Sequence, residues 1–274
     1  LKAVCDIDNS ALKSYRDLAD INLYTNFTKM LSDEKLDLVI LCTPSGLHAE
    51  QAIQASKQGM HVVTEKPMAT KYSDGLAMIN ACDKAEVRLF VVKQNRLNPT
   101  MQLLKRAKDE DRFGKINLAH VNVFWTRPQE YYDQGNGWRG TWEFDGGAFM
   151  NQASHYVDLL LWLLGPAARV QSMFSTSRKI EAEDTGIINL SWSNGSLGSM
   201  CVTMLTYPKN LEGSITLLGE KGSVRVGGVA VNEILTWDFL DCRDYDSNIN
   251  SVNYNTKSVY GNGHELYYKN IIEK

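Results

Sequence analysis

The sequence lacks the marks of several protein classes. Its longest uninterrupted apolar run, residues 159–164, is far too short for a membrane span of about 20 residues. Its net charge of −3 gives no basic surface for nucleic acid. No CxxC pair and no metal-ligand spacing occurs among its five cysteines, which are Cys5, Cys42, Cys82, Cys201 and Cys242. We therefore expect no membrane insertion, no nucleic-acid partner and no metal, with reduced thiols in a cytoplasmic protein.

A glycine-rich phosphate-binding loop is also missing. In a dinucleotide-binding fold this loop joins the first strand to its helix, so we expect it to lie upstream of residue 1. The chain begins without a Met and already within a strand-like segment. Residues 271–274 have the pattern of the middle of a helix. We expect that the chain is truncated at both termini.

Strand and helix patterns alternate through the first part of the chain. The run at residues 36–43 is continuously apolar, which is typical of a strand buried on both faces of a parallel sheet. The alternation predicts an α/β domain with a parallel sheet. The expected strands are residues 1–6, 36–43, 61–64 and 88–92, and the expected helices are residues 10–19, 47–58 and 73–85.

Polar residues follow these strands at the point where each strand ends. Parallel α/β sheets bind ligands beyond the carboxyl ends of their strands. An acid after the first strand, here Asp6, accepts hydrogen bonds from a ribose 2′-hydroxyl and favours NAD over NADP. Each loop taken alone is equally consistent with a solvated turn. Together they predict a cofactor cleft that includes Asp6, Thr43, Pro44, Glu65, Lys66 and Gln94.

The second part of the chain changes to strands with few helices. A helix is expected at residues 99–107 and an alternating strand at residues 116–124. Six further strands are predicted at residues 170–176, 185–192, 197–205, 214–218, 223–226 and 234–239. We expect a Rossmann-type domain over residues 1–96, without its first strand and glycine-rich loop. An α+β domain with a large, mostly antiparallel open sheet is expected over residues 97–274.

A helix predicted at residues 146–164 is apolar almost all round but carries one polar stripe. The stripe consists of Asn151, His155, Asp158 and Trp162, at helical spacing. Buried polar groups are costly unless they are paired. His155 is therefore either a core histidine satisfied by Asp158 or by a backbone carbonyl, or a residue that faces a ligand.

Three motifs in order resemble the glucose-fructose oxidoreductase and inositol dehydrogenase family. They are Thr43-Pro44 with His48, the signature Glu65-Lys66-Pro67, and Gly146-Gly147 followed by His155 and Asp158. The resemblance implies an NAD-dependent sugar oxidoreductase that forms a homodimer or homotetramer. It adds His48 to the cofactor-binding residues. Trp138 and Arg139 join them, because an arginine there can pair with a phosphate through two hydrogen bonds.

A narrower resemblance points to one subgroup. The common family pattern has an Asp four residues before the helix histidine, where this chain has Asn151. With Asn151 at this position and the motif Trp-Arg-Gly-Thr-Trp at residues 138–142, the chain resembles the bacterial UDP-N-acetylglucosaminuronate 3-dehydrogenases. The resemblance implies oxidation of the 3-hydroxyl of a UDP-N-acetylated glucuronic acid. Such a reaction supplies precursors of surface polysaccharide, including O-antigen.

Two residues are the catalytic candidates. A lysine ordinarily has a pKa of about 10.4 and a histidine about 6.5, so His155 suits a general base and Lys66 a donor to the developing oxyanion. Asp158, one turn after His155, is expected to fix the tautomer of its ring. A uronate and a pyrophosphate need cations and hydrogen-bonding groups. The predicted substrate residues are Arg96, Asn151, Gln152 and His155.

Two other functions remain open. The chain could be a family oxidoreductase that acts on a free sugar or polyol such as inositol, although Asn151 argues against it. It could also be a non-catalytic nucleotide-binding protein or an inactive fragment, and the missing phosphate loop is the best support for that interpretation.

Overall fold

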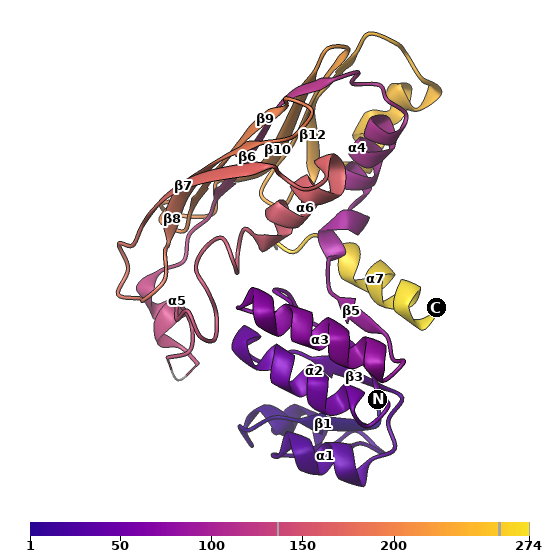
Figure 1. Cartoon of the computed structure of the whole chain (residues 1–274), viewed down its shortest axis with the longest axis vertical. Coiled ribbons are helices and arrows are strands. Elements are labelled where there is room, and N and C mark those ends of the chain that lie inside the picture. The colour runs from indigo at the N-terminus through magenta and orange to yellow at the C-terminus, as the bar shows by residue number, and fades with distance from the viewer. Residues whose placement is uncertain (136, 257–258, 274) are drawn as a thin grey trace. The chain divides into compact units, whose positions relative to one another are not determined.

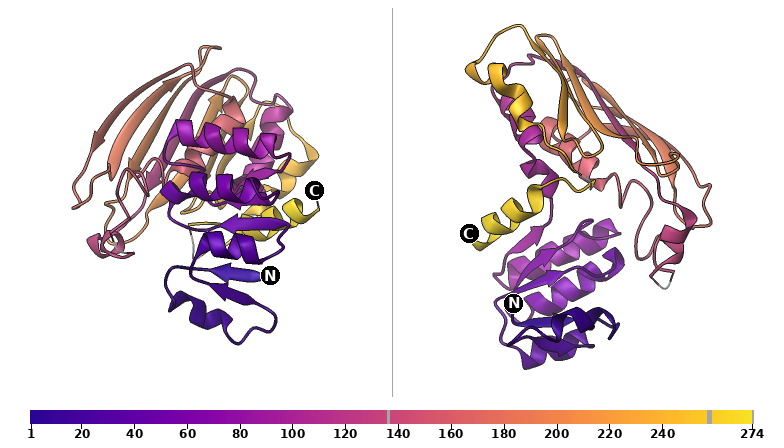
Figure 2. Two further views of the ribbon diagram at one scale, coloured as in Figure 1. Left: turned by 60° about the horizontal axis from the view of Figure 1, so that its bottom comes forward. Right: turned by 180° about the vertical axis from the view of Figure 1, so that it is seen from behind.

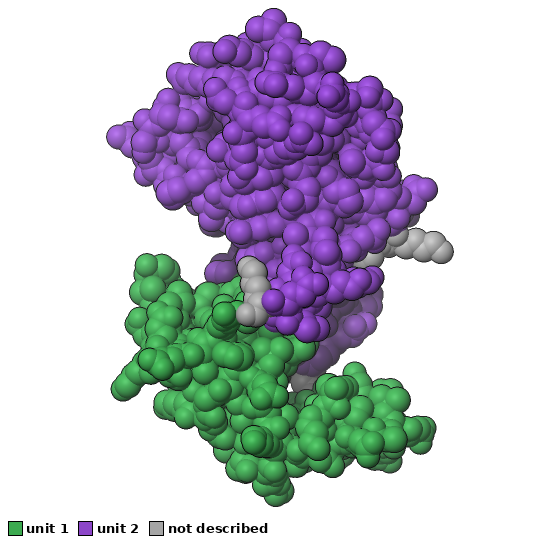
Figure 3. All heavy atoms as spheres, turned by 90° about the vertical axis from the view of Figure 1, so that its right-hand side faces the viewer, with its two compact units in different colours: residues 1–92 green, residues 93–274 purple. Residues whose placement is uncertain are grey.

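The computed structural model describes residues 1–135, 137–256 and 259–273. The chain forms two compact units, residues 1–92 and 93–274 (Figure 3). The division lies four residues before the boundary expected from the sequence. The short helix η3 (Gln94–Leu97) accounts for the difference, because it packs against α4 (Pro99–Asp109) and α7 (Gly263–Ile272) of the second unit.

The first unit alternates strands and helices, as predicted. All of its strand pairs are parallel, and they form the sheets β1-β2 and β3-β4-β5. The strands are β1 (Ala3–Cys5), β2 (Asn22–Tyr24), β3 (Leu38–Leu41), β4 (His61–Thr64) and β5 (Leu89–Val91). The helical elements are η1 (Ala11–Tyr15), α1 (Phe27–Asp33), η2 (Ser45–Leu47), α2 (His48–Ser56) and α3 (Tyr72–Lys84).

Burial explains where the sequence prediction succeeded in this unit. Val62 and Val63 of β4, the middle strand of its sheet, are fully buried. In β3, which was expected to be buried on both faces, Val39 and Leu41 are buried but Ile40 is 46% exposed, so that expectation was wrong for one face. The prediction of a helix at residues 10–19 was wrong. Only the short 3-10 helix η1 forms there, and Leu12 is its one buried residue. The sequence analysis did not predict β2 and α1, which are short and lack a clear apolar pattern.

The second unit is built on one seven-stranded sheet. Its strand order is β12-β11-β10-β6-β9-β8-β7, and every described pair except β6 with β9 is antiparallel. The expectation of a large, mostly antiparallel sheet is confirmed. The strands are β6 (Ile116–Phe124), β7 (Arg169–Ser175), β8 (Thr185–Ser191), β9 (Leu197–Thr203), β10 (Glu212–Gly219), β11 (Gly222–Gly227) and β12 (Glu233–Phe239).

Helices cover one face of this sheet. Figures 1 and 2 show α4 and α6 (Ser154–Leu164) on the same side of the strands. The core joins Leu104 of α4 and Leu159 of α6 to Val121 of β6 and Ile215 of β10, all of which are fully buried. The remaining described helices of the unit are α5 (Gln129–Asp133) and η4 (Asp244–Val252). The helices do not cover β7, since every residue of that strand is exposed to solvent.

The helix predicted at residues 146–164 is shorter than expected. Regular helix begins only at Ser154, and residues 148–153 form successive turns. Glu183 provides the reason: its backbone oxygen accepts the Ala148 N–H at 2.8 Å, and its side chain accepts the Phe149 N–H at 3.0 Å. These contacts hold the start of the segment beside the residues that lead into β8, and the backbone then follows no single helical pattern, since the Ala153 N–H donates to the carbonyl oxygen of Ala148, five residues earlier, at 2.8 Å. Most of α6 is buried, and among its leucines Leu161 is the exposed one, at 46%.

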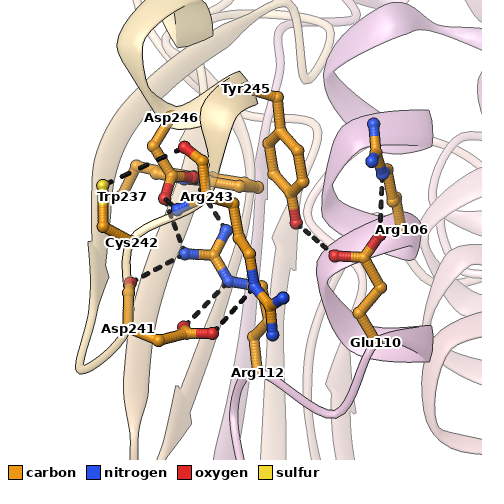
Figure 4. Close-up of polar contacts among 9 residues, drawn as sticks. All are labelled: Arg106, Glu110, Arg112, Trp237, Asp241, Cys242, Arg243, Tyr245 and Asp246. Atoms are coloured by element: carbon orange, nitrogen blue, oxygen red, sulfur yellow. Dashed lines mark hydrogen bonds and ion pairs between the residues drawn. The ribbon is translucent and has the colours of Figure 1, made fainter.

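A buried arginine ties the end of α4 to the edge of the sheet (Figure 4). The side chain of Arg112 is fully buried and forms two hydrogen bonds with Asp246, at 2.7 and 2.8 Å. It also contacts the Asp241 carboxylate at 3.1 Å and lies over the Phe239 ring. The ion pair lowers the pKa of Asp246 to about 2. Because a buried guanidinium is costly when unpaired, Asp246 must be ionised for this corner to be stable.

We predict that Asp246→Asn lowers the free energy of unfolding by about 2 kcal/mol at neutral pH. The stabilisation by Asp246 is complete above the ordinary carboxyl pKa of about 4 and is lost as pH falls toward 2. The difference between wild type and variant should therefore shrink over that range in urea-unfolding curves. The matched control is Asp241→Asn, because Asp241 is 43% exposed where Asp246 is 16% exposed. Equal losses in both variants would contradict the assignment.

Candidate active site

The loops after β3 and β4 are tied together by one histidine. His48 is 1% exposed, and its Nε2 lies 2.9 Å from the Thr43 carbonyl oxygen. Its Nδ1 lies 2.9 Å from the carbonyl oxygen of Pro67. A neutral ring donates only one hydrogen bond, whereas a protonated ring donates to both oxygens. Burial nevertheless lowers the pKa of His48, against the effect of the two carbonyl groups.

This geometry changes the role expected of His48. We predicted a direct cofactor contact, but both ring nitrogens face backbone carbonyl groups of the protein. The ring instead holds the Thr43-Pro44 loop against the loop that contains Lys66 and Pro67. His48 is therefore a buried link between two strand-end loops.

The other residues predicted at strand ends are partly accessible. Asp6 follows β1 and accepts the Asp8 N–H at 2.8 Å. Glu65 and Lys66 follow β4, are both half-buried, and are joined by a bond from the Lys66 N–H to the Glu65 carboxylate at 3.2 Å. The Thr43 hydroxyl donates to Gln51 at 2.6 Å. The first unit thus places these side chains at the carboxyl ends of its parallel strands, as the sequence predicted.

The second unit begins with buried amide side chains. Gln94 and Asn95 of η3 are 1% and 2% exposed. Within the described structure, Gln94 Oε1 and both side-chain polar atoms of Asn95 have no hydrogen-bond partner. Buried polar atoms without partners are rare in native proteins and call for a bound molecule or water. Gln94 remains a candidate for cofactor binding on this ground.

Arg96 has a partner that the sequence analysis did not predict. Its guanidinium forms two hydrogen bonds with the Asp158 carboxylate, at 2.6 and 2.7 Å, and lies 5.7 Å from the centre of the Trp162 ring. Asp158 was expected to orient His155, and the structure instead shows it paired with Arg96. Asp158 and Trp162 support Arg96, whose side chain stays 38% exposed.

Lys93 was missed by the sequence analysis. Its Nζ lies 3.8 Å from the Asp158 carboxylate, and burial lowers its pKa. The only signal in the sequence was its place immediately before Gln94, just after a predicted strand. Lys93 and Arg96 give the region around Asp158 one positive charge more than the carboxylate neutralises.

The Trp138-Arg139 segment is held by aromatic contacts. The Arg139 guanidinium lies 4.6 Å from the ring centres of both Trp138 and Tyr131, and it donates to the Tyr131 hydroxyl at 3.0 Å. Its Nε is buried and has no hydrogen-bond partner within the described structure. A pocket of about 590 Å³ opens beside Arg139 and is also lined by Lys179. Asp133 and Glu181 line the same pocket, so its two cations are balanced by two acids.

Two glycines allow the turn before α6. Gly146 has a φ of +77°, which favours glycine. A Cβ on Gly147 would lie 1.8 Å from the Glu183 carboxylate. Glu183 is 6% exposed, and burial raises its pKa. The positive φ therefore favours glycine at position 146, and the close approach of Glu183 requires glycine at position 147.

The predicted substrate residues lie within and just after this turn. Asn151 donates from Nδ2 to the carboxylate of Asp145, which is 1% exposed. Gln152, just before α6, is 5% exposed, and His155, in the first turn of α6, is 3% exposed. The structure thus brings Asn151, Gln152 and His155 into one short segment. Asp145 is a member of this group that the sequence analysis did not identify as functional.

Among residues 1–135, 137–256 and 259–273, no cluster of three or more His, Cys, Asp or Glu side chains is placed to hold a metal ion. In the same ranges, none of the helices combines the length and apolar character of a membrane span.

Two solved structures are similar to nearly the whole chain. One is the WlbA dehydrogenase of Chromobacterium violaceum in complex with NADH and UDP-GlcNAcA, with 60% identity and a TM-score of 0.93 over 99% of this chain and 76% of that one. The other is the WlbA dehydrogenase of Bordetella pertussis, in complex with the same two molecules. It is 56% identical, with a TM-score of 0.96 over 100% of this chain and 79% of that one.

Curated relatives are more distant. The NADP⁺-dependent scyllo-inositol 2-dehydrogenase of Bacillus subtilis is 28% identical over 71% of this chain. The chain spans 53% of the length of that relative and 58% of the length of another curated oxidoreductase that it matches.

Family models match both units. Residues 1–93 match the NAD-binding Rossmann fold of an oxidoreductase family, and residues 105–274 match the C-terminal alpha/beta domain of the same family. The resemblance noted in the sequence is therefore confirmed: the chain belongs to the glucose-fructose oxidoreductase and inositol dehydrogenase (Gfo/Idh/MocA) oxidoreductase family.

Proposed function

We propose that this protein is an NAD-dependent dehydrogenase of a UDP-linked N-acetylated glucuronic acid. The reaction is oxidation of the sugar 3-hydroxyl to a ketone, in the synthesis of surface polysaccharide precursors. The observation that carries the proposal is the 60% and 56% identity to two dehydrogenases solved with NADH and UDP-GlcNAcA. Each match covers 99% or more of this chain.

The residues present fit NAD. Parallel strands of the first unit end in Asp6, Thr43 and Glu65-Lys66, and ligands of such sheets bind at strand carboxyl ends. Gln94 supplies a buried oxygen without a partner in the described structure, and Arg139 a buried Nε without one, each suited to a polar group of a dinucleotide. When bound, NAD would accept the hydride. His48 contributes by holding the Thr43 and Pro67 loops together.

The chain's own residues manage the proton. We assign His155 as the base that removes the hydroxyl proton, because an imidazole ordinarily titrates near neutral pH. Lys66 donates a hydrogen bond to the oxygen as negative charge develops on it. The near-complete burial of His155 keeps bulk water from competing for its ring.

The cationic partners of the substrate are reassigned in part. Arg96 is already paired with Asp158, so it offers its remaining N–H groups rather than a full counter-charge. Lys93 adds a second cation beside the same carboxylate. We assign Arg96 and Lys93 to one anionic group of the substrate, and Asn151 and Gln152 to sugar hydroxyl or acetamido groups.

We further propose that the enzyme is a cytoplasmic homodimer or homotetramer. Its five cysteines, all within the described residues, are free thiols, which suits a reducing compartment. Exposed apolar residues such as Val170, Met173 and Ile187 on β7 and β8 support association of copies through the sheet.

The substrate prediction is tested by NADH production. UDP-N-acetylglucosaminuronate should raise absorbance at about 340 nm in the presence of NAD, and myo-inositol and glucose should not. UDP-N-acetylglucosamine is the matched control, because it differs only at C6, where a neutral hydroxymethyl group stands in place of the carboxylate. Activity on inositol or glucose at a higher kcat/KM would favour the free-sugar alternative. No turnover by a chain that binds NAD would favour a non-catalytic protein.

The catalytic assignment is tested by two substitutions. His155→Ala and Lys66→Ala should each slow single-turnover NADH formation at least about 100-fold, the usual range for general acid–base groups. NAD affinity, measured by fluorescence titration, should change less than about threefold in His155→Ala. Lys57→Ala, at an exposed position on the first unit, is the control. Near wild-type rates in both catalytic variants would show that other residues handle the proton.

A further inference from the structure

The buried carboxylate of Asp145 bonds to two segments of the chain. The proposed function places the first segment, which contains Arg139, at the cofactor and the second, which contains Asn151, at the substrate. Asp145 is 1% exposed, and its Oδ2 accepts the N–H of Gly140 at 2.7 Å. Its Oδ1 accepts a hydrogen bond from Nδ2 of Asn151. Gly140 directly follows Arg139, and Asn151 lies in the turn that leads into His155. The Asp145 carboxylate therefore bonds both to the residue that follows the proposed cofactor-binding Arg139 and to the proposed substrate-binding Asn151.

The hydrogen bond also fixes which way the Asn151 amide points. The two ends of an amide side chain are distinguished by their hydrogen-bond partners. An ionised carboxylate only accepts, so it selects the Nδ2 end of Asn151 and sets the direction of the Oδ1 end. The segment continues with a bond from the Ser154 hydroxyl to the Asn151 carbonyl oxygen at 2.8 Å, and His155 is the next residue.

We propose that Asp145 is a positioning residue of the active site, which orients Asn151 and supplies a fixed negative charge to the turn that carries His155. This inference rests on the proposed function for its kinetic consequences. In this chain the acid stands at position 145 and the amide at position 151, bonded to each other. An acid at both positions would place a partly buried carboxylate within hydrogen-bond distance of the buried Asp145 carboxylate, which is unfavourable.

The pair allows a charge-swap experiment. In Asp145→Asn the fold can persist, because the oxygen of the introduced amide still accepts the Gly140 N–H, and Asn151 can reverse to accept from its NH₂ group. The variant therefore changes the direction of Asn151 and removes the charge. Asn151→Asp creates the double carboxylate. The double variant Asp145→Asn with Asn151→Asp restores one acid and one amide in reversed order.

We expect each single variant to lower kcat at least about tenfold, with the KM for NAD changed less than about threefold. The double variant should recover at least about tenfold over Asn151→Asp. The control is Glu181→Gln, since Glu181 also accepts one N–H of the segment, from Trp142 at 3.0 Å, but is exposed. Equal kcat values in Asp145→Asn and Glu181→Gln would overturn the proposal, as would a double variant no faster than Asn151→Asp.

A readout without turnover separates this inference from the proposed function. The His155 ring can be followed by NMR in histidine-labelled protein, with its signal assigned by His155→Gln. Loss of the charge in Asp145→Asn should move the titration midpoint of His155 to lower pH by at least about half a unit, and Glu181→Gln should leave it unchanged. Wild type without activity on UDP-N-acetylglucosaminuronate contradicts the proposed function alone. An unchanged midpoint in Asp145→Asn contradicts the positioning role alone.

Discussion

A buried carboxylate is costly unless its surroundings provide hydrogen bonds, and the segment from Trp138 to His155 depends on that constraint. Asp145 and Glu183 are both nearly inaccessible to water, and each is satisfied in part by backbone N–H groups of this segment. These two contacts anchor the segment on either side of Asp145, and the chain then turns repeatedly over residues 148–153 before α6 begins at Ser154. The position of His155 at the start of α6 follows from this arrangement.

The sheet of the second unit makes the arrangement rigid. Glu183 directly precedes Asp184 and strand β8, whose seven residues pair with both β7 and β9. Asp184 is itself buried and accepts the N–H groups of Ser177 and Arg178 at 2.8 and 2.7 Å. On the other side of the turn, α6 packs its buried leucines against β6 and β10. Glu183, just before β8, thus positions the turn at Phe149, which lies 34 residues earlier in the sequence.

The sequence predicted what depends on local patterns. Strand β6 was predicted to the residue, because residues 116–124 alternate between buried and accessible side chains. The strand-end residues of the first unit were found for the same reason, since apolar runs mark where parallel strands stop. The start of α6 was not predicted, because Glu183 lies 34 residues after Phe149. Arg96 and Asp158 are 62 residues apart, so no spacing rule pairs them. Asp145 was overlooked because it lies before the predicted helix, and its separation of six residues from Asn151 does not fit the helical period.

The central claim is that hydride leaves C3 of the nucleotide sugar for the cofactor, and isotope transfer tests it most directly. UDP-N-acetylglucosaminuronate carrying deuterium at C3 would be oxidised by this protein in a single turnover with NAD, and the reduced cofactor analysed by mass spectrometry. We predict one deuterium in the reduced cofactor and a slower hydride-transfer step than with the unlabelled sugar. Reduced cofactor without deuterium, or equal rates for the two substrates under single-turnover conditions, would contradict the account.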